Sequence, residues 1–253
     1  MTTSWAVVTG ASGGLGEGFV HELGRQGSNV VLVARRREEM DRIAAEIRKA
    51  HRVETDVVAC DLSDRDQRHR LIEDLNGREV HTLVNNAGFG TLGPFHELSA
   101  DRLSQEVELN VAALTQLTRA MVPQMLERGR GAVINVASTA GFQPIPEWAV
   151  YAASKAYVRS FSHALWAEYR DTDVRVVCIS PGPTETEFFS NAGNASMMRT
   201  RRTVQDVVDS TFTALRKRRP EVVDGLGNRL VAEANRLFPT RVATLLARQV
   251  IKS

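Results

Sequence analysis

The sequence has few of the features that mark specialised classes of protein. Only two of its 253 residues are cysteines, and Cys60 and Cys178 both stand in apolar runs typical of buried strands. Two thiols in a chain of this length form no disulfide framework, so we expect both to be reduced core residues. No apolar run approaches the roughly 20 residues of a transmembrane helix. No basic and apolar leader opens the chain, so the sequence predicts a cytoplasmic protein without a signal peptide or a membrane partner.

Net charge and metal ligands are equally sparse. The formal net charge is +2, which is too small to favour nucleic acid as a partner. Basic residues cluster at 35–37, 199–202 and 216–219, and short, separate clusters of this kind are typical of a solvated surface. The six histidines are scattered without ligand spacing, so we expect no metal site.

Strand-like and helix-like segments alternate along the chain. Such alternation is typical of an α/β fold, a doubly wound parallel sheet (Rossmann fold) with helices on both faces. No linker, repeat or low-complexity segment interrupts residues 1–253, which predicts a single domain. The predicted strands are Trp5–Thr9, Val30–Val33, Asp56–Cys60, His81–Asn85, Gly131–Val136, Val174–Ile179 and Glu221–Asp224.

Two segments of the C-terminal third are predicted to decorate this domain. Residues 184–203 are polar and contain glycine and asparagine, and we expect them to form a substrate lid. Four apolar residues of the lid are expected to face the substrate, although ordinary packing is an equal alternative: Phe188, Phe189, Met197 and Met198. We expect residues 226–253 to form a helical extension that packs on the domain or on a partner subunit.

A glycine-rich turn follows the first predicted strand and precedes a helical pattern. Strand, turn and helix in this order predict a dinucleotide site, with the phosphates at the positive end of the helix. Gly10 allows the tight turn, Gly14 lets backbone amides approach a pyrophosphate, and Gly16 lets the helix pack closely. The alternative is a loop that serves only as a turn.

The second predicted strand runs into three arginines, where NAD sites carry an acidic residue for the ribose hydroxyl. Arginine suits the 2′-phosphate of NADP, because its hydrogen bonds to phosphate are charge-assisted. Arg35 directly follows the strand and is the predicted phosphate ligand, with Ser12 as a helper. Alternatively the arginines only begin the next helix, an interpretation that suits Arg36 and Arg37.

Polar residues follow the remaining predicted strands. Right-handed crossovers bring the carboxyl ends of parallel strands to one edge of the sheet, where ligands bind. The glycine turn is therefore expected to share this edge with Arg35, Asp61, Asn85, Ser138 and Pro181.

A long helix is predicted from about residue 101 to 128. Its apolar residues recur at helical spacing and include Val107, Leu109, Val111, Leu114, Leu117, Met121 and Met125. Asn110 stands inside this stripe, and asparagine is unfavourable in a helix interior. The position indicates a specific role, although a hydrogen-bonded core asparagine is the commoner explanation.

Tyr151 and Lys155 are the residues around which the predicted chemistry is organised. Four residues apart, they lie one turn apart on the same face of a helix. An ammonium near a phenol favours the phenolate and lowers a pKa that is otherwise about 10. Such a tyrosine can donate a proton to a carbonyl oxygen or accept one from an alcohol. Ser138 could hydrogen-bond the same substrate oxygen.

The ordered set of motifs over residues 4–223 resembles the short-chain dehydrogenase/reductase family in its NADP-preferring form. The matching pieces are Thr9 to Gly16, Asp61-Leu62, Asn85 to Gly88, Asn110, Ser138, Tyr151 with Lys155, and Pro181 to Thr184. The resemblance implies that Tyr151 is the general acid/base, that Lys155 lowers its pKa and holds the nicotinamide ribose, and that Ser138 binds the substrate oxygen. It implies that Asn110 holds a water of a proton relay.

The same resemblance implies the residues that contact the cofactor. These are Gly10, Ser12, Gly14, Leu15, Gly16, Arg35, Asp61, Leu62, Asn86, Tyr151, Lys155, Pro181, Gly182 and Thr184. Asp61 is expected at the adenine, and Pro181, Gly182 and Thr184 at the nicotinamide end.

These observations predict an NADP(H)-dependent oxidoreductase that interconverts a carbonyl and an alcohol. Phe142, Ile145 and Trp148 near the tyrosine favour an apolar ketone or aldehyde. The resemblance implies a homodimer or homotetramer built on the helices at about 101–128 and 148–169. The alternatives are an NAD-dependent alcohol dehydrogenase of the same fold and a non-catalytic NADP(H)-sensing protein.

Overall fold

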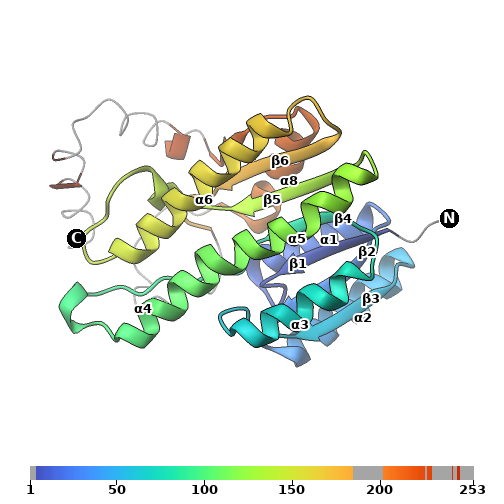
Figure 1. Cartoon of the computed structure of the whole chain (residues 1–253), viewed down its shortest axis with the longest axis horizontal. Helices are drawn as coiled ribbons and strands as arrows, with labels where there is room; N and C mark the ends of the chain where they lie inside the picture. Colours follow the sequence, from blue (N-terminus) through green and yellow to red (C-terminus); the bar gives the residue numbers. More distant parts are fainter. Residues whose placement is uncertain (1–3, 185–201, 226, 230–240, 242–243, 246–253) are drawn as a thin grey trace.

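The structure, a computed structural model, describes residues 4–184, 202–225, 227–229, 241 and 244–245. Its centre is a seven-stranded sheet in the order β3-β2-β1-β4-β5-β6-β7, and every pair of neighbours is parallel (Figure 1). The predicted α/β fold with a doubly wound parallel sheet is therefore confirmed. The strands are β1 (Trp5–Thr9), β2 (Asn29–Ala34), β3 (Thr55–Ala59), β4 (Val80–Asn85), β5 (Gly131–Val136), β6 (Val174–Ser180) and β7 (Glu221–Val223).

The strands are rich in valine and isoleucine because both faces of the sheet are covered. All six residues of β2 are buried, as are the last five of β5. Parallel strands covered on both faces read as continuous apolar runs, with no alternation of polar residues. Cys60 and Cys178 are free thiols buried within this core, as predicted.

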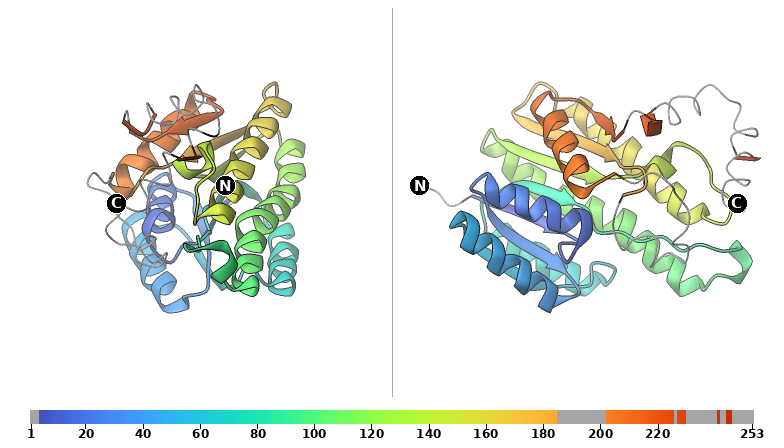
Figure 2. Two further views of the ribbon diagram at one scale, coloured as in Figure 1. Left: turned by 90° about the vertical axis from the view of Figure 1, so that its left-hand side faces the viewer. Right: turned by 180° about the vertical axis from the view of Figure 1, so that it is seen from behind.

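Three helices cover one face of the sheet, as the view from behind shows (Figure 2). They are α1 (Gly14–Arg25), α2 (Arg37–His51) and α8 (Val204–Arg216). The rings of Phe19 and Phe212 lie 6.3 Å apart and join α1 to α8. Burial of each such aromatic or aliphatic side chain contributes roughly 1.5–3 kcal/mol.

The opposite face is covered by α3 (Arg65–Asn76), α5 (Leu114–Glu127) and α6 (Ala149–Glu168). Leu75, Leu117 and Met125 are among the fully buried side chains of this layer. The Asp64 side chain accepts hydrogen bonds from the backbone amides of Asp66 and Gln67 and so caps α3, as predicted. Among the described residues, no helix has both the length and the apolarity needed to span a membrane.

The helix predicted over 101–128 is divided by a wider turn. α4 (Ala100–Val107) runs into η2 (Glu108–Ala113), which is π-helical, and then into α5. A π-turn inserts one residue and so rotates the preceding helix about its axis. The buried stripe runs from Leu114 through Asn110 to Glu106, whereas Val107 is 45% exposed. Val107 therefore lies outside the buried stripe, although it recurs at helical spacing with the other apolar residues of this helix.

Arg68 of α3 holds this divided helix in place from a buried position, since only 1% of its side chain is exposed. Its guanidinium donates to Glu108 Oε2 at 2.9 Å, to Gln116 Oε1 at 2.7 Å and to the carbonyl of Leu62 at 2.7 Å. These bonds use all three guanidinium nitrogens, which offsets part of the cost of burying the charge.

Most of the predicted lid and extension lies outside the described residues. This holds for Phe188, Phe189, Met197 and Met198, and for most of 226–253. The two ends of segment 184–203 are described and lie together. Thr184 and Arg202 form a parallel bridge, in which the Arg202 amide donates to the carbonyl of Pro183 at 3.0 Å.

An ion pair on β7 supports the loop that follows β5. Arg159 of α6 donates to Glu221 from two nitrogens at 2.6 and 2.9 Å, and Ser180 donates at 2.8 Å. A third nitrogen of Arg159 donates to the carbonyl of Gly141 at 3.1 Å. Burial alone would raise the pKa of Glu221, but the hydrogen bonds from Arg159, His163 and Ser180 outweigh it and lower the pKa to about 2.

The depressed pKa of Glu221 predicts a pH-dependent contribution to stability. Because the folded state prefers the carboxylate, the contribution is complete above the usual glutamate pKa of about 4.3 and is lost as pH falls towards 2. We expect Glu221→Gln to lower the free energy of unfolding by about 2–3 kcal/mol at pH 7 and by less at pH 3.5.

Urea unfolding of both proteins at the two pH values measures this difference. Glu127→Gln, an exposed glutamate of α5, is the matched control and is expected to leave stability almost unchanged. A loss at pH 3.5 as large as at pH 7 would contradict the ionised state assigned to Glu221.

Candidate active site

The carboxyl ends of the strands meet at the edge opposite the N label in Figure 1. Thr9, the last residue of β1, fixes this edge to the loop after β4. Its hydroxyl accepts from the backbone amides of Asn86 and Ala87 at 2.9 and 3.0 Å and donates to the carbonyl of Val84 at 3.2 Å. The Asn86 side chain donates in return to the carbonyls of Thr9 and Gly10. Asn86 therefore holds the glycine-rich turn against β4.

The glycine-rich turn cannot carry side chains at its two tightest points. Gly10 has φ of 66°, and a Cβ there would lie 2.7 Å from the side-chain nitrogen of Asn86. A Cβ on Gly16 would lie 2.7 Å from the carbonyl carbon of Gly10. The turn leads directly into α1, which begins at Gly14 and has Gly13 as its N-cap with no side-chain hydrogen bond. Backbone amides at this helix start are therefore suited to phosphate oxygens.

Arg36 reaches across this turn from the start of α2. Its Nε donates to Ser12 Oγ at 3.3 Å, and its Nη2 donates to the carbonyl of Ser12 at 3.1 Å. The sequence analysis named Ser12 as a helper of Arg35. Arg35 and Arg36 are both exposed, and the hydrogen bonds to Ser12 come from Arg36. Arg36 is thus a residue that sequence reasoning assigned only to helix initiation. The feature of the sequence that could have identified Arg36 is its position at the N-cap of α2. A long side chain at this position can turn back over the end of β2.

Asp61 and Leu62 follow β3 at the same edge. Asp61 Oδ1 accepts from the backbone amide and the hydroxyl of Ser63 at 2.9 and 2.7 Å, which holds the carboxylate in a tight turn. Leu62 is 4% exposed and packs within the core. Asp61 thus keeps a polar side chain at the edge, while the Leu62 side chain is buried in the core.

Tyr151 and Lys155 lie one turn apart on α6, as predicted, and each is 5% exposed. The Lys155 ammonium donates to the carbonyl of Val136, the last residue of β5, at 2.8 Å. It lies 5.7 Å from the centre of the Tyr151 ring. Ser138 follows β5 and caps the short helix η3 (Thr139–Phe142) by accepting from the amide of Ala140 at 3.1 Å. The structure therefore brings these three side chains together.

The pKa values of this group differ from the expectation. Burial raises the pKa of Tyr151 above its ordinary value, and the hydrogen bond with Ser138 opposes that rise only in part. Burial also lowers the pKa of Lys155 to about 8. The predicted lowering of the tyrosine pKa is not found, because the cost of burying a phenolate is the largest effect. The chain's own residues keep Tyr151 protonated, which is the form that donates a proton to a carbonyl oxygen.

Asn110 lies in the π-helical turn η2 and joins three segments. Its Oδ1 accepts from the amide of Phe89 at 3.1 Å, and its Nδ2 donates to the carbonyl of Phe89 at 2.8 Å and to Ser154 Oγ at 3.0 Å. Both donor hydrogens of the amide are used by these bonds. A Cβ on Gly88 would lie 2.9 Å from Asn110 Oδ1 and 3.4 Å from Lys155 Nζ, so the three residues lie close together.

The loop after β6 closes the site on the side of Ser138. The carbonyl of Pro181 accepts from the amide of Thr139 at 2.9 Å. Thr184 Oγ1 donates to the carbonyl of Gly182 at 3.1 Å. All the predicted site residues are described and lie at or next to strand ends of the carboxyl edge or on the helices that pack against it.

Apolar side chains form one wall beside Tyr151. Trp148 stacks on the tyrosine ring with 4.5 Å between ring centres, and Ala140, Leu92 and Ile145 belong to the same cluster. Phe142, which the sequence analysis grouped with them, instead lies under the guanidinium of Arg159 at 3.3 Å.

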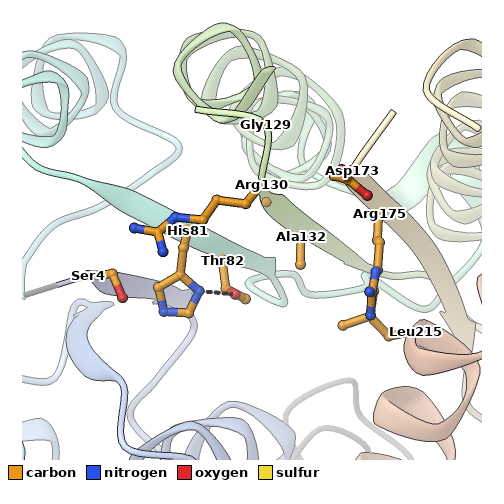
Figure 3. A pocket seen from close by; sticks show the side chains of 10 residues that line it. Ser4, His81, Thr82, Gly129, Arg130, Ala132, Asp173, Arg175 and Leu215 are labelled. Carbon is orange, nitrogen blue, oxygen red and sulfur yellow. Dashed lines mark hydrogen bonds between the residues drawn. The ribbon is translucent and has the colours of Figure 1, made fainter. Parts of the chain in front are cut away.

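A cavity of about 460 Å³ lies at the opposite, amino edge of the sheet (Figure 3). It is lined by Ser4, His81, Thr82, Gly129, Arg130, Gly131, Ala132, Asp173, Arg175 and Leu215. Two of its charged residues are already paired, Arg130 with Glu79 and Asp173 with Arg218. None of the lining residues belongs to the predicted site, so this cavity is separate from the candidate active site.

The profile of the short chain dehydrogenase family matches residues 4–196, which is most of the chain. The chain therefore belongs to the short-chain dehydrogenase family. A solved short-chain dehydrogenase from Sphingobium yanoikuyae in complex with NADPH aligns with a TM-score of 0.85 and 28% identity over 92% of this chain and 93% of that chain. A solved 7β-hydroxysteroid dehydrogenase aligns with a TM-score of 0.89 and 26% identity over 98% of this chain and 99% of that chain.

Curated relatives are longer than this chain. Very-long-chain 3-oxoacyl-CoA reductase of Anas platyrhynchos is 36% identical over 70% of this chain and 59% of its own length. The 17-beta-hydroxysteroid dehydrogenase type 3 of Rattus norvegicus is 38% identical over 72% of this chain and 60% of its own length. The chain thus spans about three fifths of the length of these relatives.

Proposed function

We propose that this protein is an NADP(H)-dependent oxidoreductase that interconverts a bulky apolar ketone or aldehyde and its alcohol. The observation that carries the proposal is the grouping of Tyr151, Lys155 and Ser138 at the edge that also holds the glycine-rich turn. An acid/base residue and a phosphate-binding turn at one sheet edge are what a nicotinamide-dependent reaction requires.

The residues at this edge suit a dinucleotide. The turn carries no side chains at Gly10, Gly13 and Gly14, so its backbone amides at the start of α1 can approach a pyrophosphate. The polar end of Lys155 lies between β5 and Tyr151, where a ribose hydroxyl could meet it. Asp61, Asn86, Gly182 and Thr184 border the same edge. The bound cofactor would supply the hydride, and the protein would orient it and move the proton.

In reduction, Tyr151 would donate its proton to the carbonyl oxygen. Its buried, protonated phenol suits this direction. Ser138, which already interacts with Tyr151, would hydrogen-bond the same substrate oxygen and stabilise its developing charge. Lys155 would stabilise the tyrosinate that remains, because its ammonium lies one helix turn away.

Arg36 and Ser12 are the residues we assign to the 2′-phosphate of NADP. The two side chains already meet beside the turn, so a phosphate there would gain charge-assisted hydrogen bonds from a preformed pair. The solved relatives in complex with NADPH and with NADP support this cofactor.

The substrate class rests on the apolar wall and on the relatives. Trp148 and Ile145 beside Tyr151 suit a carbonyl compound with bulky apolar substituents. The similar proteins include a very-long-chain 3-oxoacyl-CoA reductase, hydroxysteroid dehydrogenases and a bulky-bulky ketone specific alcohol dehydrogenase from Comamonas testosteroni. A cytoplasmic location and a homodimer or homotetramer remain predictions.

The first test removes the proton that Tyr151 would transfer. We expect Tyr151→Phe to lower kcat for NADPH-dependent reduction of a bulky aryl ketone by about 10²–10⁴-fold. NADPH affinity, measured by nicotinamide fluorescence, should change little. Tyr157→Phe is the matched control, because Tyr157 is 37% exposed on the same helix and bonds only Thr115 among the described residues. Turnover by Tyr151→Phe equal to that of the control would overturn the mechanism.

The second test separates the two neighbouring arginines. We expect Arg36→Ala to raise the Kd for NADPH by about 10-fold or more, since a hydrogen bond to a charged group is worth about 1.5–3 kcal/mol. The Kd for NADH should stay within a factor of about two. Arg35→Ala is the comparison, and it should affect NADPH less. Loss of NADPH affinity in Arg35→Ala alone would return the phosphate role to Arg35.

A further inference from the structure

Glu106 is a buried carboxyl group that the proposed reaction does not use. Its side chain is 0% exposed, within the layer between α4 and α6. In the part of the chain that the structure describes, neither carboxylate oxygen has a hydrogen-bond partner of ordinary geometry. Thr91 is the one described group that acts on the Glu106 carboxyl through hydrogen bonding, from its hydroxyl and its backbone amide, and these contacts fall outside ordinary hydrogen-bond geometry. A buried carboxyl without firm partners is costly for a fold.

The position of Glu106 follows from helical spacing. Glu106 lies four residues before Asn110, so the two side chains lie on the same face of the helix, and both are buried. Asn110 in turn lies close to Lys155, because a Cβ on Gly88 would lie 2.9 Å from Asn110 Oδ1 and 3.4 Å from Lys155 Nζ. The buried face of α4 therefore carries an acidic side chain towards the interior of the site.

The charged groups around Glu106 come from two helices. Burial raises the pKa of Glu106, while Thr91, Arg102 of α4 and Lys155 of α6 oppose the rise. In the other direction, the charge of Glu106 raises the pKa of both Lys155 and Tyr151. Among the described residues no ion pair joins Glu106 to Lys155, so the effect acts without direct contact between the two groups.

Cys178 of β6 acts on Lys155 in the same direction as Glu106. Burial raises the pKa of the Cys178 thiol to about 12, so the thiol is uncharged at the pH where Lys155 titrates. Of the two groups, this leaves Glu106 as the acid that can bring a negative charge towards Lys155.

We propose that Glu106 is a positioning residue whose buried carboxylate keeps the ammonium of Lys155 and the phenol of Tyr151 protonated together. This inference rests on the proposed function, in which reduction requires both protons in place. Burial by itself drives Lys155 towards its neutral form, and a nearby carboxylate opposes this. An apolar residue of similar size would suit the interior better, so the acid is retained at a cost to stability.

The first experiment measures the interaction without any turnover. A double-mutant cycle uses Glu106→Gln, Lys155→Met and the double variant, with urea unfolding at pH 7 and pH 10. We expect the two single effects to be non-additive at pH 7, because each removes one member of an attracting pair. The coupling should shrink at pH 10, since Lys155 has a pKa of about 8 and is then neutral.

The second experiment measures the pH profile of kcat/KM for ketone reduction with NADPH. We expect the alkaline limb of Glu106→Gln to move to lower pH by about 0.5–1 unit, less than the 1–3 units produced by charges in contact. Loss of the Glu106 charge lowers the pKa of Lys155 and of Tyr151, and both shifts move the limb the same way. Glu97→Gln, with a side chain that is 64% exposed, is the control and should leave the limb in place.

A structural role would give different results. If Glu106 only holds the Thr91 loop, Glu106→Gln and Glu106→Met should lose thermal stability, show no coupling with Lys155 and keep the alkaline limb. That pattern would overturn the inference. Under our proposal Glu106→Met melts no lower than the original protein and still shifts the limb, so it carries the test if glutamine is poorly tolerated. If the double-mutant cycle shows coupling at pH 7 but the protein reduces no ketone, the Glu106–Lys155 interaction is supported. That combination would count against the proposed function alone.

Discussion

The Lys155 ammonium, buried against the carbonyl of Val136, is the contact on which the arrangement of the site depends. It fastens α6 to the end of β5 and so places Tyr151 beside Ser138. Burying an ammonium is costly, and a single carbonyl does not offset that cost. The cost of burial is seen in both pKa values. Burial disfavours the charged forms, so it lowers the pKa of Lys155 and raises the pKa of Tyr151.

The parallel sheet supplies the second constraint. Because all strands point the same way, one edge gathers the glycine-rich turn, the Asn86 clamp and the loop of Ser138. The clamp between β1 and β4 joins the half of the site suited to phosphates with the half suited to proton transfer. The Arg159–Glu221 pair supports the second half from beneath through Gly141. Distant parts of the chain thus fix the geometry of a few polar atoms.

The sequence predicted the parts of this arrangement that follow from local pattern. All seven strands, the Asp64 cap and the placement of Tyr151 one turn from Lys155 could be found from hydrophobic runs and spacing. The π-helical turn could not, because one inserted residue leaves no mark in an apolar stripe. The buried Glu106 was missed as well, because an acidic residue in a helix is most often at the surface. Arg36 was undervalued since only three-dimensional packing shows which arginine turns back to Ser12. The direction of the Tyr151 pKa shift depends on burial, which spacing does not report.

Titration of the purified protein with NADPH and with NADH, followed by nicotinamide fluorescence, tests the central claim most directly. The account predicts saturable binding of both reduced cofactors with clear preference for NADPH, because the glycine-rich turn and the Arg36–Ser12 pair meet at one edge. Preference for NADH would contradict the phosphate role of these residues while leaving the fold and the Tyr151 group in place. Binding of neither would contradict the assignment of this edge as a cofactor site.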